Sequence, residues 1–194
     1  MRSHPWIPLL LAASAAAGAQ SLPNPAGMAP DTPRMETGNP PPDHANTQDK
    51  LFVRQATLGG RAEVELGRLA RQKGSAESVK QFGARMETDH GQANQRLARI
   101  AARAQPSIPD GLDAHHQQIR QRLDGVSGRD FDLAYLQSQV MMHQVTANLL
   151  LWEMSFGQSA ELTKYAADTL PAVMAHLETA KESLAALTST PPRN

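Results

Sequence analysis

Four residues that could bind a metal ion or exchange protons interrupt the apolar faces of four separate segments. They are Glu63, His90, His143 and His176. Apolar residues recur every three or four positions around His90, at Val79, Phe82, Met86, Leu97 and Ile100. An imidazole therefore falls on what the spacing predicts to be the buried face of a helix. Ionisable groups are rarely buried without a partner, so we expect these four side chains to meet one another.

Imidazole and carboxylate groups together are typical ligands of iron, copper and zinc. Asp89 directly precedes His90, where it could bind the metal or accept a hydrogen bond from the outer nitrogen of a ligating histidine. Glu87 and His90 form a Glu-x-x-His pair, but valine stands three residues before both other histidines, which argues against a complete di-iron set. The pattern predicts a mononuclear site with the ligands Glu63, Asp89, His90, His143 and His176.

A purely structural role is the alternative, because an interior histidine is often only a hydrogen-bonded core residue. The chain would then be a non-catalytic envelope or stress protein whose core histidines and Glu63 bond to one another. Nucleophilic catalysis is poorly supported, since cysteine is absent and no serine lies in a recognisable nucleophile motif. We predict no catalytic residue.

Hydrophobic periodicity and chain breakers divide the chain into helices. Helical spacing, with Thr47 as a candidate cap, predicts a helix that ends near Lys73-Gly74, and Ser75 can cap the next. Prolines and glycines after residue 104 and around residue 125 interrupt the pattern again. The expected helices span residues 47–73, 75–104, 113–123, 128–156 and 159–187.

Four of these helices are long, and none can bury its apolar stripe alone, which indicates a four-helix bundle. The connection over residues 105–128 is long enough to cross the bundle lengthwise, so the second and third long helices can run parallel. The four polar residues then lie within roughly 7 Å of one another along the axis, at 1.5 Å per residue. We therefore predict an all-α, ferritin-like four-helix bundle with a long helical crossover.

The chain begins with a short basic start, an apolar run and small residues before Gln20, a pattern typical of a cleaved secretory signal. We interpret residues 1–19 as a signal peptide, 20–46 as a disordered proline-rich linker, 47–188 as the bundle and 189–194 as a disordered tail. The protein is thus expected in the bacterial periplasm or outside the cell. No later segment has the roughly 20 apolar residues of a membrane span.

Composition agrees with a single helical domain. Hydrophobic residues make up 40% of the 194-residue chain and aromatic residues only 4%, which favours helices packed through aliphatic side chains. Lysine plus arginine and aspartate plus glutamate both number 19, so the charge balance predicts no nucleic-acid partner. Protein partners are not indicated by any motif.

Four ordered blocks resemble one bacterial exported family. They are FVRQATLGGRAEVELGRLA, VKQFGARMETDHGQANQRL, SGRDFDLAYLQSQVMMHQV and LPAVMAHLETA, which together cover about residues 51–187. The family is domain of unknown function 4142, and the resemblance implies a ferritin-like bundle, a signal peptide and no established activity. Its pattern maps onto Glu63, Asp89, His90, Phe131, Asp132, Tyr135, His143 and His176. Glu87 lies outside that pattern.

Overall fold

The computed structural model describes residues 45–101, 108 and 110–189. Within those ranges it contains helices and no strand: α1 (Thr47–Lys73), α2 (Glu77–Ala101), α3 (Ala114–Asp124), α4 (Gly128–Phe156) and α5 (Ala160–Ser189). The predicted all-α class is confirmed. The expected signal peptide, the linker up to residue 44, the end of the second helix at 102–104 and the tail from residue 190 lie outside the described residues.

Two helix starts are capped differently from the expectation. The cap of α1 is Asn46 rather than Thr47, because the Asn46 side chain accepts from the Asp49 backbone N–H at 2.8 Å and Asp49 accepts in return. At the start of α2, the backbone N–H groups of Ser75 and Ala76 donate to the two carboxylate oxygens of Asp132, each at 2.8 Å. A side chain from α4 therefore caps α2, which ties the first turns of both helices together.

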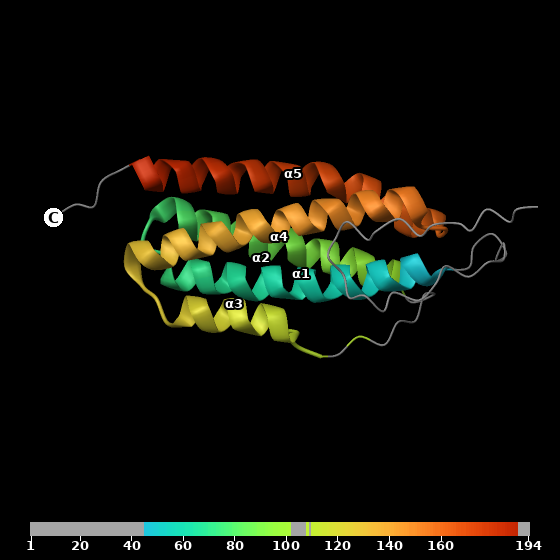
Figure 1. Ribbon diagram of the computed structural model, residues 1–194, viewed down its shortest axis with the longest axis horizontal. Helices are drawn as coiled ribbons and strands as arrows, with labels where there is room; N and C mark the ends of the chain where they lie inside the picture. The colour runs from blue at the N-terminus through green and yellow to red at the C-terminus, as the bar shows by residue number, and fades with distance from the viewer. Residues whose placement is uncertain (1–44, 102–107, 109, 190–194) are drawn as a thin grey trace, which may run out of the picture.

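The contacts at the helix ends establish the direction of each long helix. Short turns make α1 antiparallel to α2, and α4 antiparallel to α5. Asp132 places the starts of α2 and α4 at one end of the bundle. At the other end, the Asn46 side chain donates to the Phe156 carbonyl at 3.0 Å, so the start of α1 lies beside the end of α4. The helices α2 and α4 consequently run in the same direction (Figure 1).

The short helix α3 lies on the outside of the bundle and runs back along it (Figure 1). The Lys73 ammonium, at the end of α1, donates to the carbonyls of Leu123 and Asp124 at 2.9 Å each. Because cations stabilise the carbonyl end of a helix, this contact fixes the end of α3 beside the end of α1. The chain is thereby returned to the end from which α4 starts.

Two glycines allow α1 and α2 to cross closely. A Cβ atom on Gly67 would lie 2.7 Å from the Gly83 carbonyl oxygen, and a Cβ on Gly83 would lie 2.7 Å from the Gly67 oxygen. Any side chain at either position would force the two backbones apart. The two glycines therefore allow the backbones of α1 and α2 to pack closely beside the polar core.

The apolar core has two parts, with the polar residues between them. One cluster includes Phe82, Met86, Phe131 and Tyr135, and the other includes Phe52, Leu97, Leu150 and Tyr165. Along α2, α4 and α5, the histidines at 90, 143 and 176 each fall between a residue of one cluster and a residue of the other. Apolar packing on both sides thus holds the imidazoles in the middle of the bundle.

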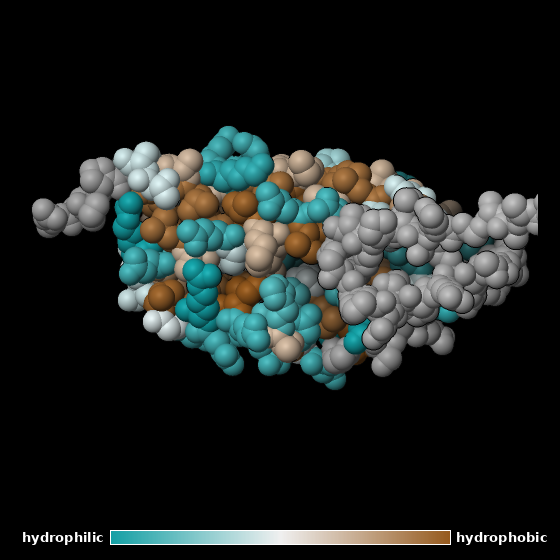
Figure 2. All heavy atoms as spheres, in the orientation of Figure 1, coloured by the Kyte–Doolittle hydropathy of each residue, from teal (hydrophilic) through white to brown (hydrophobic). Residues whose placement is uncertain are grey.

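Some large apolar side chains also reach the surface, chiefly on α4. They are Met141, Val145, Leu151, Met154, Phe156 and, on α5, Met174. Figure 2 shows apolar surface along the region where α4 and α5 lie in Figure 1. No helix in the described part of the chain combines the length and the apolar character that crossing a membrane requires.

Candidate metal centre

Three imidazoles from three helices meet in the bundle core. One nitrogen from each of His90, His143 and His176 lies within 4.8 Å of one from each of the others. The ring centroids are 5.4 to 5.6 Å apart. All three residues are buried, with exposed fractions of 8%, 1% and 2%. Helices α2, α4 and α5 therefore bring together three side chains that are far apart in sequence; we call this group the histidine cluster.

Each ring of the histidine cluster has one buried nitrogen without a hydrogen-bond partner. These atoms are His90 Nε2, His143 Nε2 and His176 Nδ1. Buried polar atoms are nearly always hydrogen-bonded, and an unpaired one costs roughly 1–3 kcal/mol. Three unpaired nitrogens at one place indicate a site built for something else to occupy.

The opposite nitrogens of two rings are hydrogen-bonded, and those bonds determine the tautomers. His143 Nδ1 lies 3.0 Å from the Gln139 backbone carbonyl, which can only accept, so Nδ1 carries the hydrogen. His176 Nε2 lies 2.9 Å from an Asp89 carboxylate oxygen, so Nε2 donates there. The lone pairs of His143 Nε2 and His176 Nδ1 are therefore free. Outer-nitrogen hydrogen bonds of this kind are typical of metal-binding histidines.

Burial favours the uncharged form of two of the three histidines, His90 and His176. Burial, together with the nearby His143 and His176, lowers the pKa of His90 to about 3. Burial also lowers the pKa of His176, although the Asp89 carboxylate partly offsets that effect. Neutral imidazole is the form that binds metal ions. At neutral pH, His90 and His176 are therefore already in the neutral form that can bind a metal ion.

Glu63 is buried beside the cluster, on the outer side of His143. One carboxylate oxygen accepts from the Gln139 side-chain amide at 2.8 Å, and the other lies 3.5 Å from His143 Nδ1. Burial raises the pKa of Glu63, and His143 and the Gln139 amide partly offset the shift. Glu63 does not belong to the group of residues whose ligand atoms converge. It instead supports His143 from behind.

Asp89 connects the cluster to the surface. Its carboxylate bridges the buried His176 and the exposed Arg85, whose Nε lies 3.3 Å away. The Asp89 side chain is itself 40% exposed. Glu87, in contrast, pairs with Arg68 and Arg71 at 3.0 and 3.1 Å, so it belongs to a surface ion pair.

Two polar neighbours were not singled out for chemistry by the sequence. Gln139 donates to Glu63 and offers its carbonyl to His143, and Tyr135 has a buried hydroxyl without a partner. Gln139 lies four residues before His143, so one turn of helix places both on the same face. That spacing was the available signal, since a fully buried glutamine on a core face also needs a partner.

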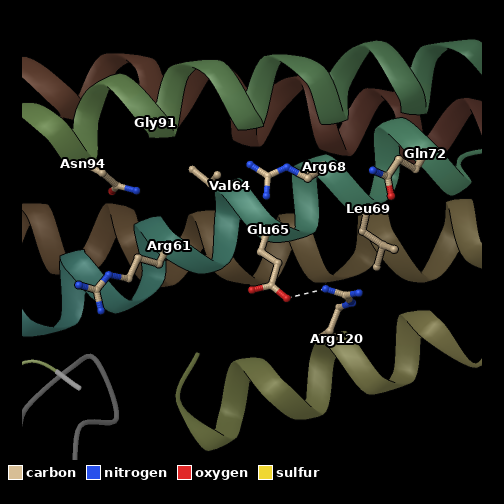
Figure 3. A pocket seen from close by; sticks show the side chains of 9 residues that line it. All are labelled: Arg61, Val64, Glu65, Arg68, Leu69, Gln72, Gly91, Asn94 and Arg120. Carbon is tan, nitrogen blue, oxygen red and sulfur yellow. Dashed lines mark hydrogen bonds and ion pairs between the residues drawn. The ribbon is translucent and has the colours of Figure 1, made fainter. Parts of the chain in front are cut away.

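A surface groove lies elsewhere, between α1, α2 and α3. It encloses about 500 Å³ and is lined by Arg61, Val64, Glu65, Arg68, Leu69, Gln72, Gly91, Asn94 and Arg120. Figure 3 shows Arg120 of α3 reaching across to Glu65 of α1. Arg68 is likewise paired with Glu87. Because these charges already pair within the protein, the groove offers weaker chemistry than the histidine cluster.

The histidine cluster can therefore accept a positively charged species. One nitrogen from each of the three rings converges on this place, and hydrogen bonds from behind orient two of the rings. The lowered pKa values of His90 and His176 leave these two imidazoles neutral at neutral pH. Imidazole nitrogens are common ligands of zinc, copper and iron.

Comparison with known proteins identifies a family without assigning a chemistry. Searches of curated proteins and of solved structures give no match. The family model described as "Domain of unknown function (DUF4142)" matches residues 34–182, which include α1 to α4 and most of α5. This is the family that the four sequence blocks resemble. The chain therefore belongs to the DUF4142 family.

Proposed function

We propose that this chain is a metal-binding helical-bundle protein, in which His90, His143 and His176 hold one transition-metal ion in the bundle core. The observation that supports the proposal is the convergence of three buried imidazole nitrogens that have no hydrogen-bond partner. A bound cation would satisfy all three lone pairs at once.

Iron, copper and zinc are the metals that this donor set suits. Imidazole binds all three well, and the chain has no cysteine that would favour thiolate sites. Around zinc, with Zn–N distances of about 2.0–2.1 Å, tetrahedral geometry places ligand nitrogens roughly 3.3 Å apart. Starting from nitrogens within 4.8 Å of one another, each needs to move by less than about 1 Å. Side-chain rotation can supply that contraction.

Asp89 and Glu63 complete the proposed site from behind the ligands. Asp89 accepts from His176 Nε2, and Glu63 lies beside His143 Nδ1. Carboxylates in such positions hold the ring orientation and make the imidazole a stronger donor. We therefore assign both residues to the support of the ligands.

We further propose that the bundle is ferritin-like and that the protein is exported. The shared direction of α2 and α4, with α3 returning along the bundle, supports the first proposal. The sequence of residues 1–19 supports a cleaved signal and a location in the periplasm or outside the cell. A linker over 20–46, a bundle over 47–188 and a tail over 189–194 complete the proposed organisation. Binding, and not turnover of a substrate, is the proposed activity.

A structural role in which the cluster holds a water molecule is the second candidate. The observation that favours it is the 4.8 Å limit on the nitrogen spacing, since a water at the centre could lie at hydrogen-bonding distance from all three rings. His90 Nε2 would donate to that water, which would donate in turn to His143 and His176. Every buried nitrogen would then be satisfied without a metal.

Titration of metal ions into the mature chain, residues 20–194, distinguishes the metal site from the water-filled cluster. We expect wild-type protein to bind one zinc or copper ion per chain, and His90→Ala to lower the affinity by at least about 100-fold. His115→Ala, at an exposed histidine on α3, is the matched control and should bind like wild type. Circular dichroism of the metal-free variants checks that each is folded. Absence of binding tighter than micromolar in wild-type protein would favour the structural role.

A further inference from the structure

We infer that the metal site keeps one coordination position open for a small exogenous ligand, either water or a small anion. The inference rests on the proposed metal site and concerns the part of the coordination sphere that the three histidines leave unfilled. Two carboxylates lie close enough to the cluster to be considered as further ligands, Glu63 and Asp89. The positions of these two carboxylates decide whether the protein supplies a fourth ligand to the metal ion.

Asp89 lies on the wrong side of His176 to bind the same ion. Its oxygen is 2.9 Å from His176 Nε2, whereas the free lone pair belongs to Nδ1. These two nitrogens point in diverging directions from the imidazole ring. Asp89 is held there by Arg85 as well, at 3.3 Å. It therefore supports His176 from the far side of the ring.

Glu63 is placed in the same way behind His143. It lies 3.5 Å from His143 Nδ1, the nitrogen that faces the Gln139 carbonyl, while the free lone pair belongs to Nε2. The other carboxylate oxygen is held by the Gln139 side-chain amide at 2.8 Å. Both carboxylates thus face the outer nitrogens of their histidines.

Within the described ranges, only the three histidines offer ligand atoms that converge on this point. Zinc and copper(II) bind four or more ligands, and sites with three protein ligands keep a position for an exchangeable molecule. Three neutral imidazoles leave the charge of a divalent ion uncompensated in its inner sphere, which favours a small anion over a neutral ligand. His90 is the most exposed of the three residues, at 8%.

Azide binding to the copper(II)-loaded full chain tests the inference. Azide is a small monodentate anion, and its coordination to copper(II) produces a new ligand-to-metal charge-transfer absorption band. We expect this band to grow with azide and to saturate at one azide per copper. A spectrum that stays unchanged at saturating azide would overturn the open position.

The amide variants Asp89→Asn and Glu63→Gln identify a protein carboxylate that has moved in as a fourth ligand. Because we place both carboxylates behind the histidines, each variant, once saturated with copper(II), should still show the azide band. A band that appears only in one variant would overturn the inference and would identify the missing carboxylate as the ligand. A wild-type chain that binds no copper would instead contradict the proposed function itself.

Discussion

Two groups of buried polar residues in this bundle differ in how the cost of their burial is compensated. The histidine cluster joins α2, α4 and α5 at the middle of the bundle. The second group, which we call the carboxyl pair, consists of Asp49 on α1 and Glu153 on α4, both with an exposed fraction of 0%. Burying either group in water-free surroundings is costly unless a partner compensates it.

The carboxyl pair is compensated by backbone N–H groups and by one bound proton. Asp49 accepts hydrogen bonds from the backbone N–H groups of Asn46, Gln158 and Ser159, so it ties the start of α1 to the start of α5. Neither oxygen of an ionised Glu153 has a partner. Burial, and then the hydrogen bond and charge of Asp49, raise the pKa of Glu153 to about 9. Protonated Glu153 donates its O–H to Asp49, and a proton from water satisfies the pair.

The histidine cluster has no such solution within the chain. One nitrogen of each ring has no partner, the outer nitrogens of His143 and His176 are already hydrogen-bonded, and burial opposes protonation of His90. The comparison shows that buried polar residues differ in which partner they still need, a proton or another ligand. The carboxyl pair lacks a proton, which solvent supplies, whereas we propose that the histidine cluster lacks a metal ion.

Glu153→Gln should produce the largest effect, through the pH dependence of stability. The pKa of this carboxyl is about 4.5 unfolded and about 9 folded, so its stabilising contribution is complete below pH 4.5 and is lost as pH rises towards 9. At about 1.4 kcal/mol per pH unit, the loss reaches about 6 kcal/mol at most. Glutamine cannot ionise, so the variant should be more stable than wild type at pH 9 and similar at pH 5.

Urea unfolding at several pH values checks this prediction. Glu182→Gln, at an exposed position on α5, is the matched control and should follow wild type at every pH. If Glu153→Gln and wild type kept a constant difference in the free energy of unfolding from pH 5 to pH 9, Glu153 would not hold a proton in the folded protein.

Asp49→Ala should destabilise the fold by about 2–4 kcal/mol, because the backbone N–H groups that begin α1 and α5 lose their acceptor. The measurement is best made at pH 5, where Glu153 is protonated in the folded state. Asp168→Ala removes an exposed carboxylate that pairs with Arg96 and Lys164, and should change stability by only about 0.5 kcal/mol. Equal effects of the two variants would show that Asp49 does not clamp the helix starts.

Asp89→Asn should give the smallest of these effects, and it tests the histidine cluster instead of the carboxyl pair. Loss of the carboxylate behind His176 should lower metal affinity by about 10–100-fold. The free energy of unfolding of the metal-free protein should change little, because Asp89 is partly exposed. Asp168→Asn is the control for removing a carboxylate, measured by the same titration. Metal affinity that is unaffected by Asp89→Asn would remove this residue from the site.

Much of the architecture follows from local sequence signals. Periodicity and breakers place the limits of α4 at Gly128 and Phe156, as the structure has them. Local signals succeed there because a glycine and a helical apolar stripe act within a few residues. Local signals could not predict the cap of α2, because the acceptor Asp132 lies on another helix, 56 residues from Ala76.

The site was predictable only in part for the same reason. The seam positions of His90, His143 and His176 follow from spacing, and the structure brings all three together. Spacing could not tell that Glu63 lies beside an outer nitrogen of His143, since that depends on side-chain rotamers from two helices. Glu153 falls three residues after the buried Leu150, so its burial was readable, but its partner Asp49 resembles an ordinary first-turn acid.

The most direct test of the metal centre is a crystal structure of zinc-loaded protein with anomalous diffraction at the zinc absorption edge. We predict one strong peak, about 2.0–2.1 Å from His90 Nε2, His143 Nε2 and His176 Nδ1. The contradicting result is a folded, zinc-treated protein with no anomalous peak in the histidine cluster, or with zinc only at surface groups such as Asp113 and His116.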